Sequence, residues 1–268
     1  MSTATPNWQP LFDALWQQYL EVTPSALAIH QLLSHDGTIN NDHIALRTFN
    51  SSPVQLEALA APFEALGYQA KGDYQFNAKK LRAKHYEHPD PLAPKVFISE
   101  LLVEQCSAQL QQIVAGLVNQ LSPEMTASHS WVHSGRPWQV STAQYQQLIA
   151  ESEYAGWLAA WGYRANHFTV SVNQLPDNPP LAAVNNRLQE AGFVLNSSGG
   201  LIKGSRADLL EQSSTMADQA ICQFSDGELT IASCFYEFAK RYPKADGTLY
   251  SGFVAASADK IFESTHQS

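Results

Sequence analysis

The sequence lacks the features that would direct it to a membrane or to a nucleic acid. None of its apolar runs approaches the ~20 residues that a membrane-spanning helix requires. Its 16 Lys and Arg residues are outnumbered by 25 Asp and Glu residues, for a formal net charge of −9. A surface that binds nucleic acid or an anionic membrane needs a basic stripe, so we expect neither partner. Small anionic ligands are not excluded, because one inward Arg can hold a carboxylate whatever the net charge.

Cysteines are few, and no CxxC pair occurs. The three cysteines, Cys106, Cys222 and Cys234, are widely spaced, which favours buried free thiols in a reducing compartment over a disulfide framework. The first residues, MSTATPNWQPLFD, carry neither the basic nor the apolar region of a signal peptide. We therefore expect a cytoplasmic protein.

The chain does have enough apolar residues for a large core. Its 268 residues, 44% of them hydrophobic, fit one large domain or two fused modules. Hydrophobic periodicity divides the single domain that we expect into four parts. These are N-terminal helices (1–40), a first module (41–104), a helical and loop insert (105–165) and a second module with a C-terminal segment (166–268).

Both modules repeat one order of elements. The first has a β-rich run at 43–49, a helical stretch at 54–66 and extended runs from Tyr68, within 81–88 and within 95–103. In the second, a strand (166–173) precedes a helix (181–191), extended structure from Phe193, a flexible GGLIKGS loop (199–205) and later strands within 209–224 and 229–242. Between these last two runs, Asp226-Gly227 predicts a hairpin turn.

The spacing of His and Gly residues supports a duplication. Twenty-four residues separate His43 from Gly67, and 25 separate His167 from Gly192. In both cases a polar residue precedes the His and an aromatic residue follows the Gly, which indicates a repeated supersecondary unit. We therefore predict an α+β fold in which two βαβββ modules form a curved sheet, with additional helices.

This arrangement predicts a metal site. If the modules pack about a pseudo-twofold axis, the first strands lie close together, and His43 and His167 face one another. Glu237, in the apolar run CFYEFAKRY, is the third candidate, because a carboxylate on an apolar face is costly unless it is paired or coordinated. Two His and one carboxylate with open positions are typical of non-haem Fe(II) oxygenases. Each residue alone is as consistent with an ordinary structural role.

Arg47 shares a strand face with His43, because residues two apart in a strand point the same way. A buried Arg would need an anion, and its planar fork suits a carboxylate. A twist or bulge could instead carry Arg47 to the surface. For the remaining candidates, His85, Ser171, Ser198, Lys203 and Gln219, a structural or surface role is favoured. His129 and His133 lie in a predicted irregular loop within the insert.

Four segments together resemble the short form of the 2-oxoadipate dioxygenase/decarboxylase family, a member of the vicinal-oxygen-chelate superfamily. The segments are HIALRTF, RANHFTVSVN, CFYEFAKRYP and GFVAASADKIFEST, and the resemblance runs from about residue 5 to the C-terminus. The most specific parts are the His-x-x-x-Arg strand and the Tyr-Glu-Phe-x-x-Arg strand. The second also resembles the final strand of hydroxyphenylpyruvate dioxygenases, where an Arg follows the iron-binding Glu by four residues, as Arg241 does here.

The resemblance implies that Fe(2+) binds to His43, His167 and Glu237. It implies that Arg47 grips a substrate carboxylate and that a backbone group of the 253–258 run, matched to Val254, contacts substrate. His43 is the third residue assigned to substrate binding. The implied reaction converts 2-oxoadipate and O2 to 2-hydroxyglutarate and CO2, in lysine catabolism. Insertions of the longer members are missing, which leaves the identity of the 2-oxo acid open. The sequence does not determine the oligomeric state.

Two other function classes stay open. One is a metal-dependent isomerase or hydrolase on the same fold, with a fourth protein ligand. Glu100 is the candidate, because it lies late in the first module, roughly where Glu237 lies in the second. The other is a non-enzymatic protein that binds a small molecule between the modules without a metal.

Overall fold

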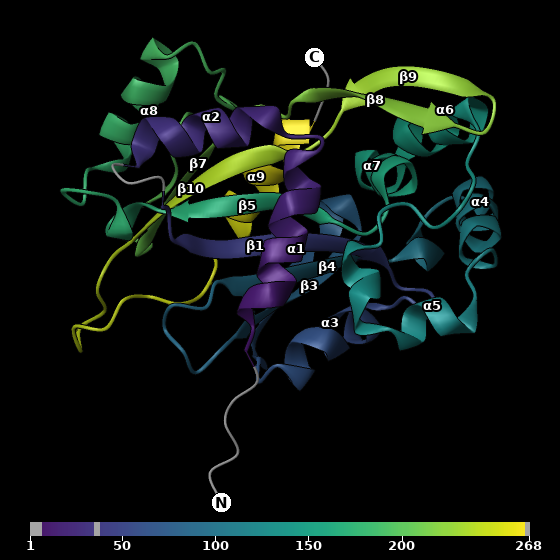
Figure 1. Ribbon diagram of the computed structural model, residues 1–268, viewed down its shortest axis with the longest axis horizontal. Helices are drawn as coiled ribbons and strands as arrows, with labels where there is room; N and C mark the ends of the chain where they lie inside the picture. Colours follow the sequence, from purple (N-terminus) through teal and green to yellow (C-terminus); the bar gives the residue numbers. More distant parts are fainter. Residues whose placement is uncertain (1–6, 35–37, 266–268) are drawn as a thin grey trace, which may run out of the picture.

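A computed structural model describes residues 7–34 and 38–265, and a large curved sheet runs through its middle (Figure 1). Its strands, in spatial order, are β2 (Gln69–Phe76), β3 (Leu81–Glu87), β4 (Lys95–Leu101), β1 (Asn41–Phe49), β5 (Ala165–Ser171), β10 (Phe235–Arg241), β7 (Leu210–Ser214) and β6 (Lys203–Ser205). The helices of eight or more residues are α1 (Gln9–Leu20), α2 (Pro24–Leu33), α3 (Leu56–Ala65), α4 (Ala108–Val118), α6 (Thr142–Glu151), α7 (Glu153–Trp161) and α8 (Leu181–Glu190).

The sheet consists of two halves with the same topology. In the first half β1 pairs parallel with β4, and β3 and β2 follow antiparallel. In the second half β5 pairs parallel with β10, and β7 and β6 follow antiparallel. The halves meet where β1 and β5 pair antiparallel. The prediction of an α+β fold with two βαβββ modules is therefore confirmed, while the four-part division of the chain stays a prediction.

The matched glycines end the matched helices. Gly67 follows α3 with a φ of 102°, and Gly192 follows α8 with a φ of 90°. Glycine adopts this left-handed conformation without the steric cost that other residues incur.

The second half departs from the prediction in two places. The extended structure predicted from Phe193 is limited to an antiparallel bridge between Leu195 and Thr215, after which the chain enters a loop. The Asn196 amide donates hydrogen bonds to the carbonyl of Lys260 and to Ser264 Oγ. The end of the predicted GGLIKGS loop forms the short edge strand β6. The hairpin at Asp226-Gly227 is confirmed, but its strands β8 (Gln219–Phe224) and β9 (Gly227–Ala232) form a separate two-stranded sheet.

Helices cover both faces of the large sheet. On the outer face, α1 buries Phe12, Leu15 and Tyr19, and the Tyr19 hydroxyl donates a hydrogen bond to the Phe235 carbonyl. Against the inner face lies α9 (Ala255–Ile261), continued by a 3-10 turn (Phe262–Thr265). Helix α9 contacts both edge strands, β2 and β6, so the sheet curls around it. Figure 1 shows α9 behind the sheet and α1 and α2 in front.

The insert packs beside the end of β1. It comprises α4, a short helix α5 (Pro123–Ala127), a 3-10 turn (His129–His133), α6 and α7, with α7 buried. The predicted irregular loop thus contains short helical turns. The three cysteines are buried and free, as expected. Among the described helices, none has the length and apolar character to cross a membrane.

Candidate metal centre

Three predicted ligands meet on the inner face of the central strands. His43, His167 and Glu237 come from the neighbouring strands β1, β5 and β10, and their ligand atoms lie within 4.8 Å of one another. His167 Nε2 lies 3.1 Å from Glu237 Oε2, and His43 Nε2 lies 3.7 Å from Glu237 Oε1. All three side chains are at least 93% buried. The structure therefore brings together the two histidines that the duplication predicted and the carboxylate predicted from the apolar run CFYEFAKRY.

Irregular strand pairing explains how each histidine is oriented. The register between β1 and β5 shifts by one residue at Asp42 and again at Asn166, the residues before the two histidines. Adjacent side chains of a regular strand point to opposite faces, whereas a bulge re-aims them. As a result, Asp42 Oδ1 lies 2.8 Å from His43 Nδ1, and Asn166 Oδ1 lies 3.2 Å from His167 Nδ1.

A buried ion pair holds Asp42 in turn. Arg241 Nε and Nη2 donate to the two Asp42 carboxylate oxygens at 2.7 and 2.8 Å. Arg241 Nη1 donates to the carbonyls of Tyr250 and Gly252. Oxygen partners on Nδ1 of a metal-binding His fix its ring and leave Nε2 for the metal. The ion pair therefore couples the orientation of His43 to β10 and the loop that follows it.

Glu237 is held as a carboxylate. The Gln212 amide donates a 2.6 Å hydrogen bond to Glu237 Oε1. Burial alone would raise the pKa of Glu237, but His43 and His167 lower it to about 2. Burial is also the main reason that the pKa of His167 lies below its usual value. A neutral imidazole and an ionised carboxylate are the forms that bind a metal.

The donor set fits a divalent transition metal. Two imidazoles and one carboxylate converge, both Nδ1 atoms have oxygen partners, and both Nε2 atoms face the carboxylate. His43 Nε2 also lies 3.1 Å from Thr169 Oγ1, so this hydroxyl would give up its contact when a metal binds. The combination suits non-haem Fe(II) among other divalent metals.

The position that Glu237 occupies in the second half is held by Phe97 in the first. Glu237 pairs with Thr169, two residues beyond His167, and Phe97 pairs with Ala45, two residues beyond His43. The expectation that Glu100 matches Glu237 was therefore wrong. Glu100 points to the opposite face, where it accepts hydrogen bonds from the Leu56 backbone N–H and from Arg82. No fourth protein ligand comes from this position.

A small cavity of about 20 Å³ adjoins the three candidate ligands. The C-terminal segment closes it, and its lining comprises His43, Ala45, Phe97, His167, Gln212, Glu237, Phe253, Ala258, Ile261 and Phe262. Phe253 packs edge-on against His43, with ring centroids 4.7 Å apart. Val254 does not line the cavity; its carbonyl accepts the Ser257 and Ala258 N–H groups at the start of α9.

Arg47 is buried, not carried to the surface by a twist. It is 2% exposed, lies farther along β1 than the cavity, and does not line it. Its Nη1 lies 3.1 Å from Glu153 Oε1 on α7. The anion that a buried Arg requires is therefore supplied by the insert in this structure.

Sequence reasoning missed the residues that support the ligands. The polar residues before each His were noticed only as part of the repeat, and Arg241 only through its spacing from Glu237. Gln212 carries no signal, because it lies in a short polar strand. Of the lesser candidates, His85 is buried between Tyr74 and Glu87, Lys203 donates to the Asn196 carbonyl, and Gln219 is exposed.

Comparisons with known proteins agree with this geometry. A family model described as 2-oxoadipate dioxygenase/decarboxylase matches residues 2–129 and 123–245. A chloroplastic 2-oxoadipate dioxygenase/decarboxylase of Arabidopsis thaliana is 35% identical over 278 residues, which cover 93% of this chain and 75% of the relative.

Solved structures show the same fold. The hydroxyglutarate synthase of Oryza sativa in complex with 2-oxoadipate superposes with a TM-score of 0.90 at 32% identity, covering 99% of this chain and 97% of that one. A Shewanella frigidimarina protein, provisionally named a hydrolase, gives a TM-score of 0.90 at 58% identity, covering 95% and 100%. A Ralstonia eutropha protein provisionally placed in the glyoxalase superfamily gives 0.74 at 21% identity, covering 91% and 85%, which supports the vicinal-oxygen-chelate type of fold.

Proposed function

The chain belongs to the 2-oxoadipate dioxygenase/decarboxylase family, and from this premise we propose that it converts 2-oxoadipate and O2 to 2-hydroxyglutarate and CO2 with Fe(II) held by His43, His167 and Glu237. The observation that carries the proposal is the buried two-His, one-carboxylate cluster with Phe97 in the fourth position. Three protein ligands leave room for a chelating substrate and for O2.

What Fe(II) supplies when bound is the O2 chemistry that no side chain possesses. The chain's own residues orient the substrate and exclude water. A 2-oxo acid would offer its keto and adjacent carboxylate oxygens at the open side of the cluster. Four strand residues, about 13 Å along β1 at ~3.3 Å each, separate His43 from Arg47. We assign the second carboxylate, at the far end of the substrate, to the long side chain of Arg47, which shares a strand face with His43.

The covering segment must move for substrate to enter. A cavity of about 20 Å³ has room for little more than one water molecule, whereas 2-oxoadipate has a six-carbon chain. Displacing α9 enlarges the space next to Phe253 and Phe262, and their return excludes water during the reaction. Val254, at the start of α9, would then lie at the moving boundary, where its backbone would contact substrate near His43.

An anaerobic reconstitution tests the proposal. The protein is loaded with Fe(II), mixed with 2-oxoadipate and exposed to O2, while O2 uptake, CO2 release and 2-hydroxyglutarate are measured. We expect equal amounts of all three, with both atoms of ¹⁸O2 in the products. Bound iron without O2 uptake on any 2-oxo diacid would contradict the proposal.

The provisional hydrolase name of the Shewanella frigidimarina relative makes a second outcome worth measuring. A hydrolase would retain Zn(II) as purified and consume no O2. A binding protein without catalysis would show ligand binding in the absence of any metal. Metal analysis of the purified protein and the O2 assay together separate these alternatives. A cytoplasmic location and a role in lysine catabolism remain part of the proposal.

A further inference from the structure

The guanidinium of Arg47 uses its nitrogens unequally: Nη1 has a carboxylate partner and Nε has none among the described residues. Both Glu153 carboxylate oxygens lie on the single nitrogen Nη1, at 3.1 and 3.3 Å. Nη2 makes a long 3.4 Å contact with Thr265 Oγ1. Within residues 7–34 and 38–265, Nε has no hydrogen-bond partner although it is buried. The edge formed by Nε and Nη2 is therefore the weakly used one.

Aromatic rings lie close to this guanidinium. Its central carbon lies 4.9 Å from the ring centroids of both Tyr154 and Trp157 and 5.7 Å from that of Phe262. Tyr154 is itself anchored, because its hydroxyl accepts the Thr48 N–H and donates to the Ser99 carbonyl. Aromatic rings therefore pack around the guanidinium, while its carboxylate partner lies on Nη1 alone.

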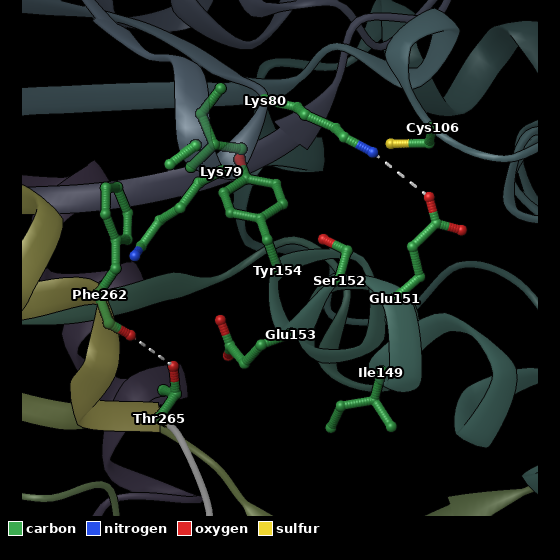
Figure 2. A pocket seen from close by; sticks show the side chains of 12 residues that line it. Lys79, Lys80, Cys106, Ile149, Glu151, Ser152, Glu153, Tyr154, Phe262 and Thr265 are labelled. Carbon is green, nitrogen blue, oxygen red and sulfur yellow. Dashed lines mark hydrogen bonds and ion pairs between the residues drawn. The ribbon is translucent and has the colours of Figure 1, made fainter.

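Glu153 reaches Arg47 from a pocket outside the metal cavity. This pocket has a volume of about 540 Å³ and shares Phe262 with the cavity. Figure 2 shows the Glu153 carboxylate on the side of Thr265 and Phe262, while Glu151, in the same pocket, points away towards Lys80. The Glu153 side chain is 17% exposed, whereas that of Arg47 is 1% exposed. Glu153 therefore approaches Arg47 from this pocket, and it occupies Nη1 without contacting Nε.

We propose that Glu153 is a positioning residue that selects 2-oxo diacids. By holding Nη1 end-on, it keeps the Nε–Nη2 edge of Arg47 free to donate two parallel hydrogen bonds to the second carboxylate of the substrate. A carboxylate matches such a two-nitrogen edge, and bidentate pairing adds both energy and directional specificity. This inference rests on the proposed function, in which Arg47 takes that carboxylate.

The test compares two ligands that differ in that carboxylate alone. Dissociation constants are measured anaerobically by calorimetry on the Fe(II)-loaded enzyme for 2-oxoadipate and for 2-oxohexanoate, which has the same six-carbon chain. In Glu153→Gln, we expect 2-oxoadipate to bind about tenfold more weakly and 2-oxohexanoate to change less than twofold. Glu151→Gln, which removes a charge from the same pocket without touching Arg47, is the matched control and should change neither.

Other results would overturn the inference. Unchanged or tighter binding of 2-oxoadipate to Glu153→Gln would show that Glu153 is only a counter-ion or a competitor for Arg47. An equal loss for both ligands would show a general structural role. Should that variant not fold, Glu153→Asp keeps the charge but shortens the side chain, and it must still weaken 2-oxoadipate selectively. Arg47→Met tests the role of Arg47 separately from that of Glu153. If this variant keeps the preference for the diacid, the proposed role of Arg47 fails as well.

Discussion

The two halves of the sheet share one topology but contribute differently to the metal centre. Each places a histidine on its first strand and a polar residue at a register shift just before it. On the matched parallel strand, the second half has Glu237 and the first half has Phe97. One apolar side chain at the symmetric position, Phe97, therefore limits the candidate metal site to three protein ligands from these matched strands.

The residues next to the candidate ligands also differ between the halves. Gln212, which holds Glu237, lies on β7 opposite Ala239, and the corresponding residue of β3, opposite Ser99, is Ala83. In β5, the position of Arg47 is taken by Ser171, four residues beyond His167. The second half therefore supplies the carboxylate of the candidate metal site, and the first half supplies Phe97 and Arg47 at the matched positions.

Removing the second-half ligand gives the largest expected effect. Glu237→Ala should lose most bound Fe(II) and at least about 1,000-fold in activity, because two imidazoles alone hold iron weakly. Metal content after gel filtration and O2 uptake measure this. His85→Ala removes another buried histidine of the inner face and should keep its iron. Full metal content in Glu237→Ala would refute the assignment.

Making the first half resemble the second should close the site. Phe97→Glu is expected to bind metal at least as tightly but to lose about 100-fold or more in O2 consumption, because a fourth ligand takes an open position. Phe97→Leu serves as the control and should retain most activity. If Phe97→Glu consumes O2 at the wild-type rate, the correspondence with Glu237 has no functional meaning.

Asn166 precedes His167 in the second half, where Asp42 precedes His43 in the first. Replacing Asp42 by Asn should weaken the orientation of the His43 ring. Asp42→Asn leaves Arg241 buried without its ion-pair partner, so we expect metal affinity to fall about 10- to 100-fold. The free energy of unfolding should fall by about 3 kcal/mol. Metal titration and urea denaturation measure the two effects. Adding Arg241→Met should restore stability but not metal affinity, and recovery of both would argue against a role for Asp42 in orienting His43.

A smaller loss is expected when β7 is made to resemble β3. Gln212→Ala should weaken metal binding by about tenfold, near the lower end of the range for outer partners of metal ligands. It should leave the discrimination between 2-oxoadipate and 2-oxohexanoate intact, since Arg47 is untouched. Competition with a chelator gives the affinity, and a loss of ligand discrimination would show that Gln212 contacts substrate directly.

The smallest effect on the centre is expected at Glu100. Glu100→Gln weakens the hydrogen bond to the Leu56 N–H and the ion pair with Arg82. The free energy of unfolding should fall by about 1–2 kcal/mol while metal affinity stays unchanged. A drop in metal affinity would restore Glu100 as a participant.

The sequence predicts the candidate metal ligands better than it predicts the residues that contact them. Periodicity and the repeated His-to-Gly spacing place His43 and His167 correctly, because topology alone brings the first strands together. The match of Glu100 to Glu237 failed because position along a module does not determine hydrogen-bond register across β1 and β4. Asp42 was overlooked as a partner of His43 because simple alternation sends neighbouring side chains to opposite faces. Glu153 could not be paired with Arg47, since it lies in an insert that the repeat does not describe.

The register shifts at Asp42 and Asn166 also restrict where residues can be inserted into the chain or deleted from it. Deleting one residue at either position would straighten the strand, and a slip of one residue sends a side chain to the opposite face of a sheet. The following histidine would then point to the outer face of the sheet, away from the other two candidate ligands. Codon insertions and deletions should therefore be tolerated in the loop before β6 but not within two residues of either histidine, although substitutions there can leave the fold intact.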